Sequence, residues 1–194
     1  MCSDTLNTTL ILASRSPRRR DLLAAAGYQF EVRLAAESAE EGSPGDQDAA
    51  TLVARFALRK ASDVGLGVRR GLILGCDTVA ECEGAILGKP ANAEHARQML
   101  STLRGREHRV FSGLCLWSKP HQEPITEVDV TVLRMDPLED EQIDEYVASG
   151  AWRGKAGAFG LQDRMGWVHI VRGSESNVVG LPMELLARML DRLR

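Results

Sequence analysis

The chain has 194 residues, of which 44% are hydrophobic and 26% are charged, and its formal net charge is −3. This length and composition are typical of a folded globular protein with a sizeable core and exclude a disordered chain. The slightly acidic balance argues against bulk nucleic-acid binding, which needs a broad basic surface, so any recognition of an anion has to be local.

The cysteines and the N-terminus predict a cytoplasmic protein. The four cysteines form no CxxC pair and have no zinc-like spacing with the four histidines, which favours a reduced cytosolic setting. No apolar run approaches the ~20 residues that span a membrane, so we expect no membrane partner. The polar start "MCSDTLNTT" lacks the charged and apolar regions of a signal peptide.

The N-terminal third predicts a strand followed by a helix. Residues 10–13 ("LILA") have the pattern of a short buried strand, and Pro17 suits the first turn of a helix that ends at Gly27. We expect a flexible N-terminus over residues 1–9 and a single domain over residues 10–194.

The remaining elements predict a mixed α/β sheet flanked by helices. Strands alternate with helices, but several strands adjoin directly, as in antiparallel pairs. In chain order we expect a strand at 30–34, a helix at 48–64, a buried strand ending at Asp77 with a continuation or hairpin around Glu83-Gly84, a helix at 93–103, antiparallel strands at 109–117 and 126–134, an acidic helix ending at Gly150, a strand at 167–171 and a closing helix within 177–193.

The segment "LASRSPRRR" places two serines and four arginines at the predicted strand-to-helix junction. Backbone N–H groups at a helix start are unpaired and favour an anion, and guanidinium groups match phosphate oxygens. The alternative is that Ser14 or Ser16 caps the helix and that the arginines are solvated. Capping needs one serine and does not explain Arg18, Arg19 and Arg20, so we favour a phosphate site. The GxxxxGK[ST] spacing of a P-loop is absent.

Three further polar residues have a functional and a structural interpretation. Asp77 follows a buried apolar run, where a carboxylate binds a divalent metal or deprotonates a water, or else caps a turn. Lys89 in "LGKP" offers an ammonium to a phosphate or is an exposed loop residue. Lys60, taken alone, is expected to be a solvated helix residue.

The segment "GKAGAFGLQD" combines small residues with an amide. The Gln162 side chain has a donor and an acceptor that suit the edge of a nucleobase. The small residues either bring backbone close to a ligand or serve a close-packed crossing of strands. In "GSESNVVGLP" we expect Ser176 or Asn177 to act as a helix cap.

Six segments together, "LASRSPRR", "ALRKA", "GCDTV", "LGKP", "GKAGAFGLQ" and "NVVGLP", resemble the Maf family of nucleoside triphosphate pyrophosphatases in content and order. The resemblance covers nearly the whole chain, from Leu10 to about Leu193. It implies an ITPase-like α/β fold, in which two lobes surround a central cleft, and a homodimer.

The resemblance also implies an activity, the hydrolysis of a nucleoside triphosphate between its α and β phosphates with Mg²⁺ or Mn²⁺. It implies a house-cleaning role and a link to cell-division arrest. In this sequence the implied roles are Asp77 as general base or metal ligand and Ser14, Arg18, Arg19, Lys60 and Lys89 as phosphate-binding residues.

Substrate choice within the resemblance rests on Arg18, Thr78 and Gln162, which match the branch that resembles dTTP/UTP pyrophosphatases. The resemblance implies a second metal carboxylate within "AAESAEEG", which offers Glu37, Glu40 and Glu41 without a clear register, and we assign it to Glu40 or Glu41. The alternatives are a pyrophosphatase for 7-methyl-GTP or another modified purine nucleotide, and a non-catalytic nucleotide-binding regulator of septum formation.

Overall fold

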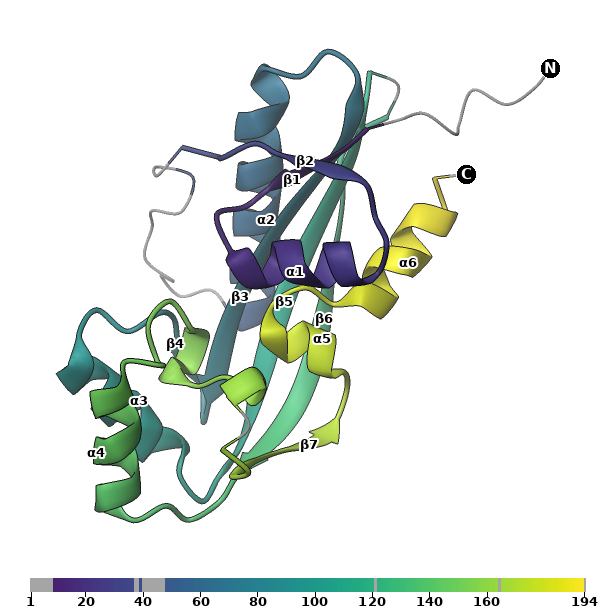
Figure 1. The fold of residues 1–194 in the computed structure, drawn as a ribbon. Coiled ribbons are helices and arrows are strands. Elements are labelled where there is room, and N and C mark those ends of the chain that lie inside the picture. Colours follow the sequence, from purple (N-terminus) through teal and green to yellow (C-terminus); the bar gives the residue numbers. More distant parts are fainter. Residues whose placement is uncertain (1–8, 37–38, 40–47, 121, 164, 194) are drawn as a thin grey trace.

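The structure is a computed structural model that describes residues 9–36, 39, 48–120, 122–163 and 165–193. Figure 1 shows its elements. In chain order these are β1 (Leu10–Ala13), α1 (Pro17–Ala25), β2 (Phe30–Val32), α2 (Ala49–Leu66), β3 (Gly71–Cys82), β4 (Ala85–Leu87), α3 (Ala93–Leu103), β5 (Glu107–Lys119), β6 (Ile125–Met135), α4 (Asp140–Ser149), the 3-10 turns η2 (Ala156–Ala158) and η3 (Leu161–Asp163), β7 (Val168–Arg172), α5 (Glu175–Val179) and α6 (Met183–Asp191). The helices that the structure describes include none long and apolar enough to cross a membrane.

The strands form one mixed sheet, as the sequence predicts. Its order is β2-β1-β3-β5-β6-β7, and β4 pairs with the far end of β3. The pairs of β1 with β2 and with β3 are parallel, and the remaining pairs are antiparallel. The expected hairpin at Glu83-Gly84 joins β3 to β4, and the predicted pairing of the two long strands is that of β5 with β6.

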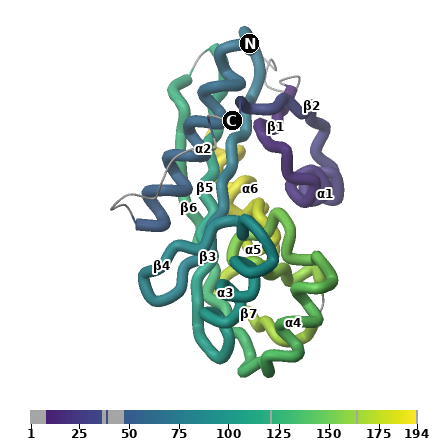
Figure 2. Tube along the Cα trace, turned by 90° about the vertical axis from the view of Figure 1, so that its left-hand side faces the viewer, coloured from purple at the N-terminus to yellow at the C-terminus, as the bar shows by residue number. Residues whose placement is uncertain are grey.

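Two lobes share the long strands β3, β5 and β6, which run through both of them (Figures 1 and 2). One lobe carries β1, β2, α1, α2 and α6, and the other carries β4, α3, α4 and β7. This arrangement confirms the predicted mixed α/β fold.

In the first lobe, helices cover both faces of β1, and all four residues of "LILA" are buried. Leu10 and Leu12 pack in a cluster with residues of α1 and α6, whereas Ile11 and Ala13 pack in a cluster with residues of α2. Alternate side chains of a strand point to opposite faces, so a fully apolar strand marks a sheet covered on both sides.

Two glycines let α2 approach the sheet closely. A Cβ atom on Gly75 would lie 2.2 Å from the carbonyl oxygen of Ala57, and one on Gly113 would lie 2.4 Å from that of Val53. Because any side chain at these points would push the helix away, the glycines set the depth at which α2 and its Lys60 lie over β3.

The expected end of a strand at Asp77 is wrong, because β3 continues to Cys82. What changes near Asp77 is the strand that pairs with β3 on one of its two edges. β1 pairs with residues 72–75 of β3, and β4 pairs with residues 80–82. Of the strands that the structure describes, none pairs with residues 76–79 on this edge. Asp77 therefore lies where the parallel part of the sheet ends, although its own strand continues.

Candidate functional site

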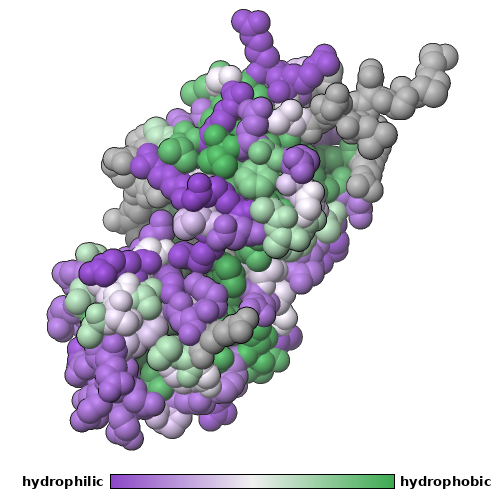
Figure 3. Space-filling view, viewed as in Figure 1, coloured by the Kyte–Doolittle hydropathy of each residue, from purple (hydrophilic) through white to green (hydrophobic). Residues whose placement is uncertain are grey.

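A cleft of about 310 Å³ opens at this gap in the sheet edge and is lined by residues of both lobes. In the space-filling view, hydrophilic residues dominate α1 and the waist between the lobes (Figure 3). All predicted site residues within the described part of the chain line the cleft, and these are Ser14, Arg18, Arg19, Lys60, Asp77, Thr78, Lys89 and Gln162. Segments far apart in the sequence thus supply one site.

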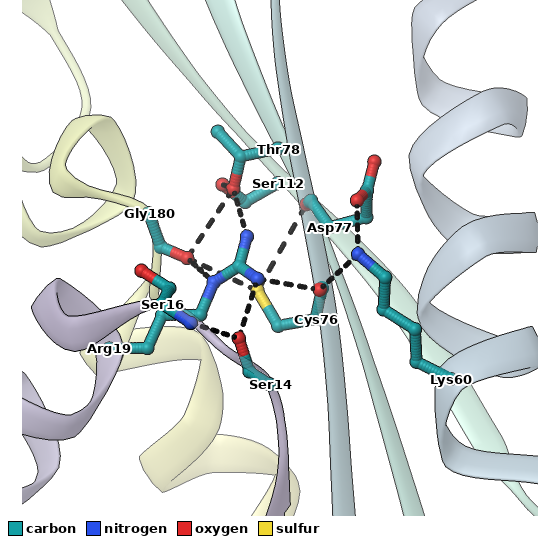
Figure 4. Close-up of polar contacts among 9 residues, drawn as sticks. All are labelled: Ser14, Ser16, Arg19, Lys60, Cys76, Asp77, Thr78, Ser112 and Gly180. Carbon is teal, nitrogen blue, oxygen red and sulfur yellow. Dashed lines mark hydrogen bonds and ion pairs between the residues drawn. The ribbon is translucent and has the colours of Figure 1, made fainter. Parts of the chain in front are cut away.

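Arg19 connects three segments of the chain at the floor of the cleft (Figure 4). Its Nε donates to the carbonyl oxygen of Gly180 at 2.7 Å, and one terminal nitrogen donates to Ser14 Oγ and to the carbonyl oxygen of Cys76, at 3.1 and 2.9 Å. The other terminal nitrogen donates to Thr78 Oγ1 at 3.0 Å. Four of the five guanidinium N–H groups are thus used by the protein, and Arg19 is buried.

Ser14 orders the junction instead of capping the helix. Its Oγ accepts hydrogen bonds from the backbone N–H of Ser16 and from Arg19. Ser16 occupies the N-cap position of α1, but its side chain makes no capping hydrogen bond. Neither serine is thus a side-chain cap, and the helix start stays open toward the cleft, which suits an anion.

Lys60 and Asp77 form an ion pair across the gap between α2 and β3 (Figure 4). Lys60 Nζ lies 2.7 Å from Asp77 Oδ1, and the two side chains are 3% and 18% exposed. The expectation that Lys60 is a solvated helix residue is wrong, because the close approach of α2 buries it. A buried ammonium needs a counter-charge, and Asp77 supplies it while keeping part of its surface open to the cleft.

Thr78 occupies the next position on β3 and points toward α5. It lies directly opposite Ser112 of β5 in the antiparallel pair, and the two hydroxyl oxygens are 2.8 Å apart. Thr78 also donates to the carbonyl oxygen of Gly180 at 3.3 Å. No sequence pattern singles out Ser112, because its role depends on the register of the two strands.

Arg18 joins the two lobes. Its guanidinium donates to the carbonyl oxygen of Gly154 at 2.7 Å. Burial, together with the neighbouring positive charge of Arg19, lowers the pKa of Arg18, and the carboxylate of Asp163 opposes this shift. Arg18 therefore lies in a locally positive site, as expected of a phosphate-binding residue.

The glycine-rich segment before Gln162 packs closely against β3. Gly157 has a φ of +66°, and a Cβ atom there would lie 2.9 Å from the Cβ of Ala80. Its N–H donates to the carbonyl oxygen of Gly88, so this segment is tied to the "LGKP" loop. Gln162 is exposed at the edge of the cleft, where its amide is available to a ligand.

The cleft is strongly positive although the whole chain is not. Its described lining includes seven basic side chains, Arg15, Arg18, Arg19, Lys60, Lys89, Arg153 and Lys155, and one carboxylate, Asp77. The sequence pattern does not single out Arg153 or Lys155 as a site residue, although Lys155 stands in the "GKAG" segment. This concentration of positive charge in a chain of net charge −3 is consistent with the prediction that recognition of an anion has to be local.

Among the described residues the cleft offers one carboxylate to a metal ion, that of Asp77. Glu40 and Glu41 lie outside the described residues. The described part of the chain contains no cluster of three or more His, Cys, Asp or Glu side chains that could hold a metal ion. Mg²⁺ is commonly bound by one or two carboxylates together with substrate phosphates, and Asp77 is a single carboxylate that is partly open to the cleft.

The predicted helix cap at Ser176 or Asn177 is only partly right. Ser174 caps α5, and Ser176 Oγ accepts the first backbone N–H of α6, from Met183. Asn177 is buried and donates instead to Thr131 and to the backbone of β5. It thereby fixes α5 and the adjoining Gly180 against the sheet.

The chain is similar to known proteins over most of its length. A protein named dTTP/UTP pyrophosphatase from Rhodopirellula baltica is 52% identical over 184 residues, 94% of this chain and 81% of the relative. One of the same name from Dictyoglomus thermophilum is 38% identical over 95% of both chains. The solved structure of a HAM1 protein from Coxiella burnetii aligns with a TM-score of 0.51 at 14% identity, covering 96% of this chain and all of that one, which supports the fold. The family model described as Maf-like protein matches residues 9–193, and the chain therefore belongs to the Maf family.

Proposed function

We propose that the protein is a nucleoside triphosphate pyrophosphatase that hydrolyses dTTP and UTP between the α and β phosphates and releases the monophosphate and pyrophosphate. The observation that carries this proposal is the cleft, in which seven basic side chains surround one carboxylate. The names of the relatives support the choice of nucleotide.

The basic residues are assigned to the triphosphate. Arg18, Lys60 and Lys89 lie on three different segments around the cleft and would neutralise the phosphate charge and the charge that develops on the pyrophosphate leaving group. Arg19 and Ser14 have a more structural part, since most of their hydrogen bonds hold the floor of the site. Arg19 still contributes its positive charge and one further N–H.

Asp77 is assigned as the general base. It is the carboxylate of the described cleft lining, and its 18% exposed surface lets a water reach it. Lys60 fixes one of its oxygens at 2.7 Å, so the carboxylate is oriented before the substrate binds. Asp77, with Glu40 or Glu41, would also hold Mg²⁺ or Mn²⁺, which when bound lowers the pKa of a coordinated water.

Base recognition is assigned to Arg18, Thr78 and Gln162. The Gln162 amide has the paired donor and acceptor that a pyrimidine edge requires. Arg18 comes from α1, Thr78 from β3 and Gln162 from η3, so a nucleotide in the cleft would contact three separate segments.

The test is pyrophosphate release from dTTP, UTP, CTP, ATP, GTP and 7-methyl-GTP with Mg²⁺ or Mn²⁺, using wild type, Asp77→Asn and Gln162→Ala. Asp144→Asn is the matched control, because it removes the same charge from an exposed pair with Arg97 outside the cleft. We expect wild type and control to prefer UTP and dTTP, and Gln162→Ala to lose that preference.

Asp77→Asn is expected to retain nucleotide binding and to lose at least about 100-fold in kcat, the lower range for a catalytic base. More than a tenth of the wild-type rate in this variant would remove the base role. Turnover of 7-methyl-GTP alone would keep the chemistry and overturn the assigned substrate. Tight binding without turnover in the wild type would point to a regulator.

A further inference from the structure

An ion pair closes the loop that carries Gln162. Lys155 stands immediately before η2, and Asp163 is the last residue of η3, so the two residues are the ends of the segment 155–163, here called the Gln162 loop. Lys155 Nζ donates to both carboxylate oxygens of Asp163. This ion pair thus connects the first and last residues of the loop.

The Asp163 carboxylate also anchors the loop to the second lobe. Tyr146 of α4, a buried residue, donates its hydroxyl hydrogen to Asp163 Oδ2 at 2.5 Å. Burial and the adjacent carboxylate raise the pKa of Tyr146, so the phenol stays protonated and remains a donor. Lys155 is buried as well and needs the counter-charge of Asp163.

The residue that precedes the loop contacts the first lobe. Arg18 donates to the carbonyl oxygen of Gly154, the residue before Lys155. Arg18 and Lys155 both line the cleft, and Asp163 interacts electrostatically with Arg18 while pairing with Lys155. One carboxylate beside the cleft therefore pairs with Lys155 and attracts the guanidinium of Arg18.

We propose that Asp163 is a positioning residue that determines base specificity, because it holds the Gln162 loop closed and fixes the amide of Gln162 at the edge of the cleft. This inference rests on the proposed function. Preorganisation of a contact group lowers the ordering cost paid on binding, and a misplacement of about 1 Å costs up to about 100-fold in rate.

The test compares Asp163→Asn with Asp140→Asn. Asp140 is a matched control because it also pairs with basic side chains, Arg97 and Arg104, but is 57% exposed and outside the cleft. For both variants, kcat and KM are measured with UTP and CTP. Hydrogen exchange is followed by mass spectrometry over residues 156–162.

For Asp163→Asn we expect the KM for UTP to rise about 10-fold with kcat within about 3-fold, and the UTP-over-CTP ratio of kcat/KM to fall about 10-fold, because the loss is one of positioning. The Gln162 loop should exchange faster. Asp140→Asn should change none of these. Asp163→Glu, which keeps the charge, should recover part of the selectivity.

Unchanged selectivity and exchange in Asp163→Asn would overturn the inference, as would an equal fall in kcat for every nucleotide. If Asp163→Asn does not fold, Tyr146→Phe removes a single hydrogen bond to the same carboxylate, and unchanged selectivity there would count against the proposal. Failure of the wild type to cleave UTP or dTTP would instead refute the proposed function, and unchanged hydrogen exchange would separately refute the anchoring.

Discussion

The ion pair between Lys60 and Asp77 predicts that removal of either side chain destabilises the protein, but by different amounts. Lys60→Met keeps the aliphatic stem and removes the ammonium, which leaves the Asp77 carboxylate without its partner at 2.7 Å. Asp77→Ala does the reverse and leaves the ammonium. Lys60 is 3% exposed and Asp77 is 18% exposed. The remaining charge is therefore buried in Asp77→Ala and partly hydrated in Lys60→Met.

The magnitudes follow from these exposures. Removing one partner of a buried pair costs about 3–5 kcal/mol when the remaining charge has no access to water, and Asp77→Ala is expected in this range. Lys60→Met is expected to cost about 1–2 kcal/mol, because water from the cleft hydrates the remaining carboxylate. For a chain of this length each kcal/mol lowers Tm by about 2–4 °C.

The assay is urea unfolding of wild type, both single variants and the double variant, which gives the coupling free energy between the side chains. We expect Asp77→Ala to be the less stable single variant and the double variant to be more stable than the sum of the two losses predicts. A larger loss in Lys60→Met, or additive losses, would refute the reasoning from burial.

Two further predictions concern the packing of α2 and the second lobe. Gly75→Ala should destabilise the protein by about 1–3 kcal/mol and lower kcat/KM, because the added Cβ would meet the backbone of α2 and displace Lys60. Gly88→Ala is the control, because a Cβ at Gly88 would meet no atom within 4 Å. Equal urea midpoints for the two variants would contradict the prediction. Burial lowers the pKa of His108 from 6.5 to about 4, so the unfolded chain takes up a proton first and stability falls as pH drops from about 6.5 to 4, by about 2 kcal/mol at pH 5. Urea unfolding at pH 7 and at pH 5 should show this loss of stability in wild type and a smaller loss in His108→Gln. An equal loss of stability in the two proteins would exclude His108 as the cause.

Local sequence was sufficient to predict most of the elements and to indicate an anion site. The apolar "LILA" run, the helical spacing in α2 and the alternation in β6 predicted these elements, because burial on one or two faces has a period that the chain displays directly. The concentration of arginines at a strand-to-helix junction, in a chain without net positive charge, indicated a local anion site.

Only the tertiary structure decided which charges are buried and which residues cooperate. Lys60 has the local sequence of a solvated helix residue, and it is buried because Gly75 and Gly113, distant in sequence, let α2 approach the sheet. Ser112 meets Thr78, and Asp163 meets Tyr146, through strand register and loop closure. Such pairings depend on distances between segments, and the period of a single segment carries no information about its distance from another.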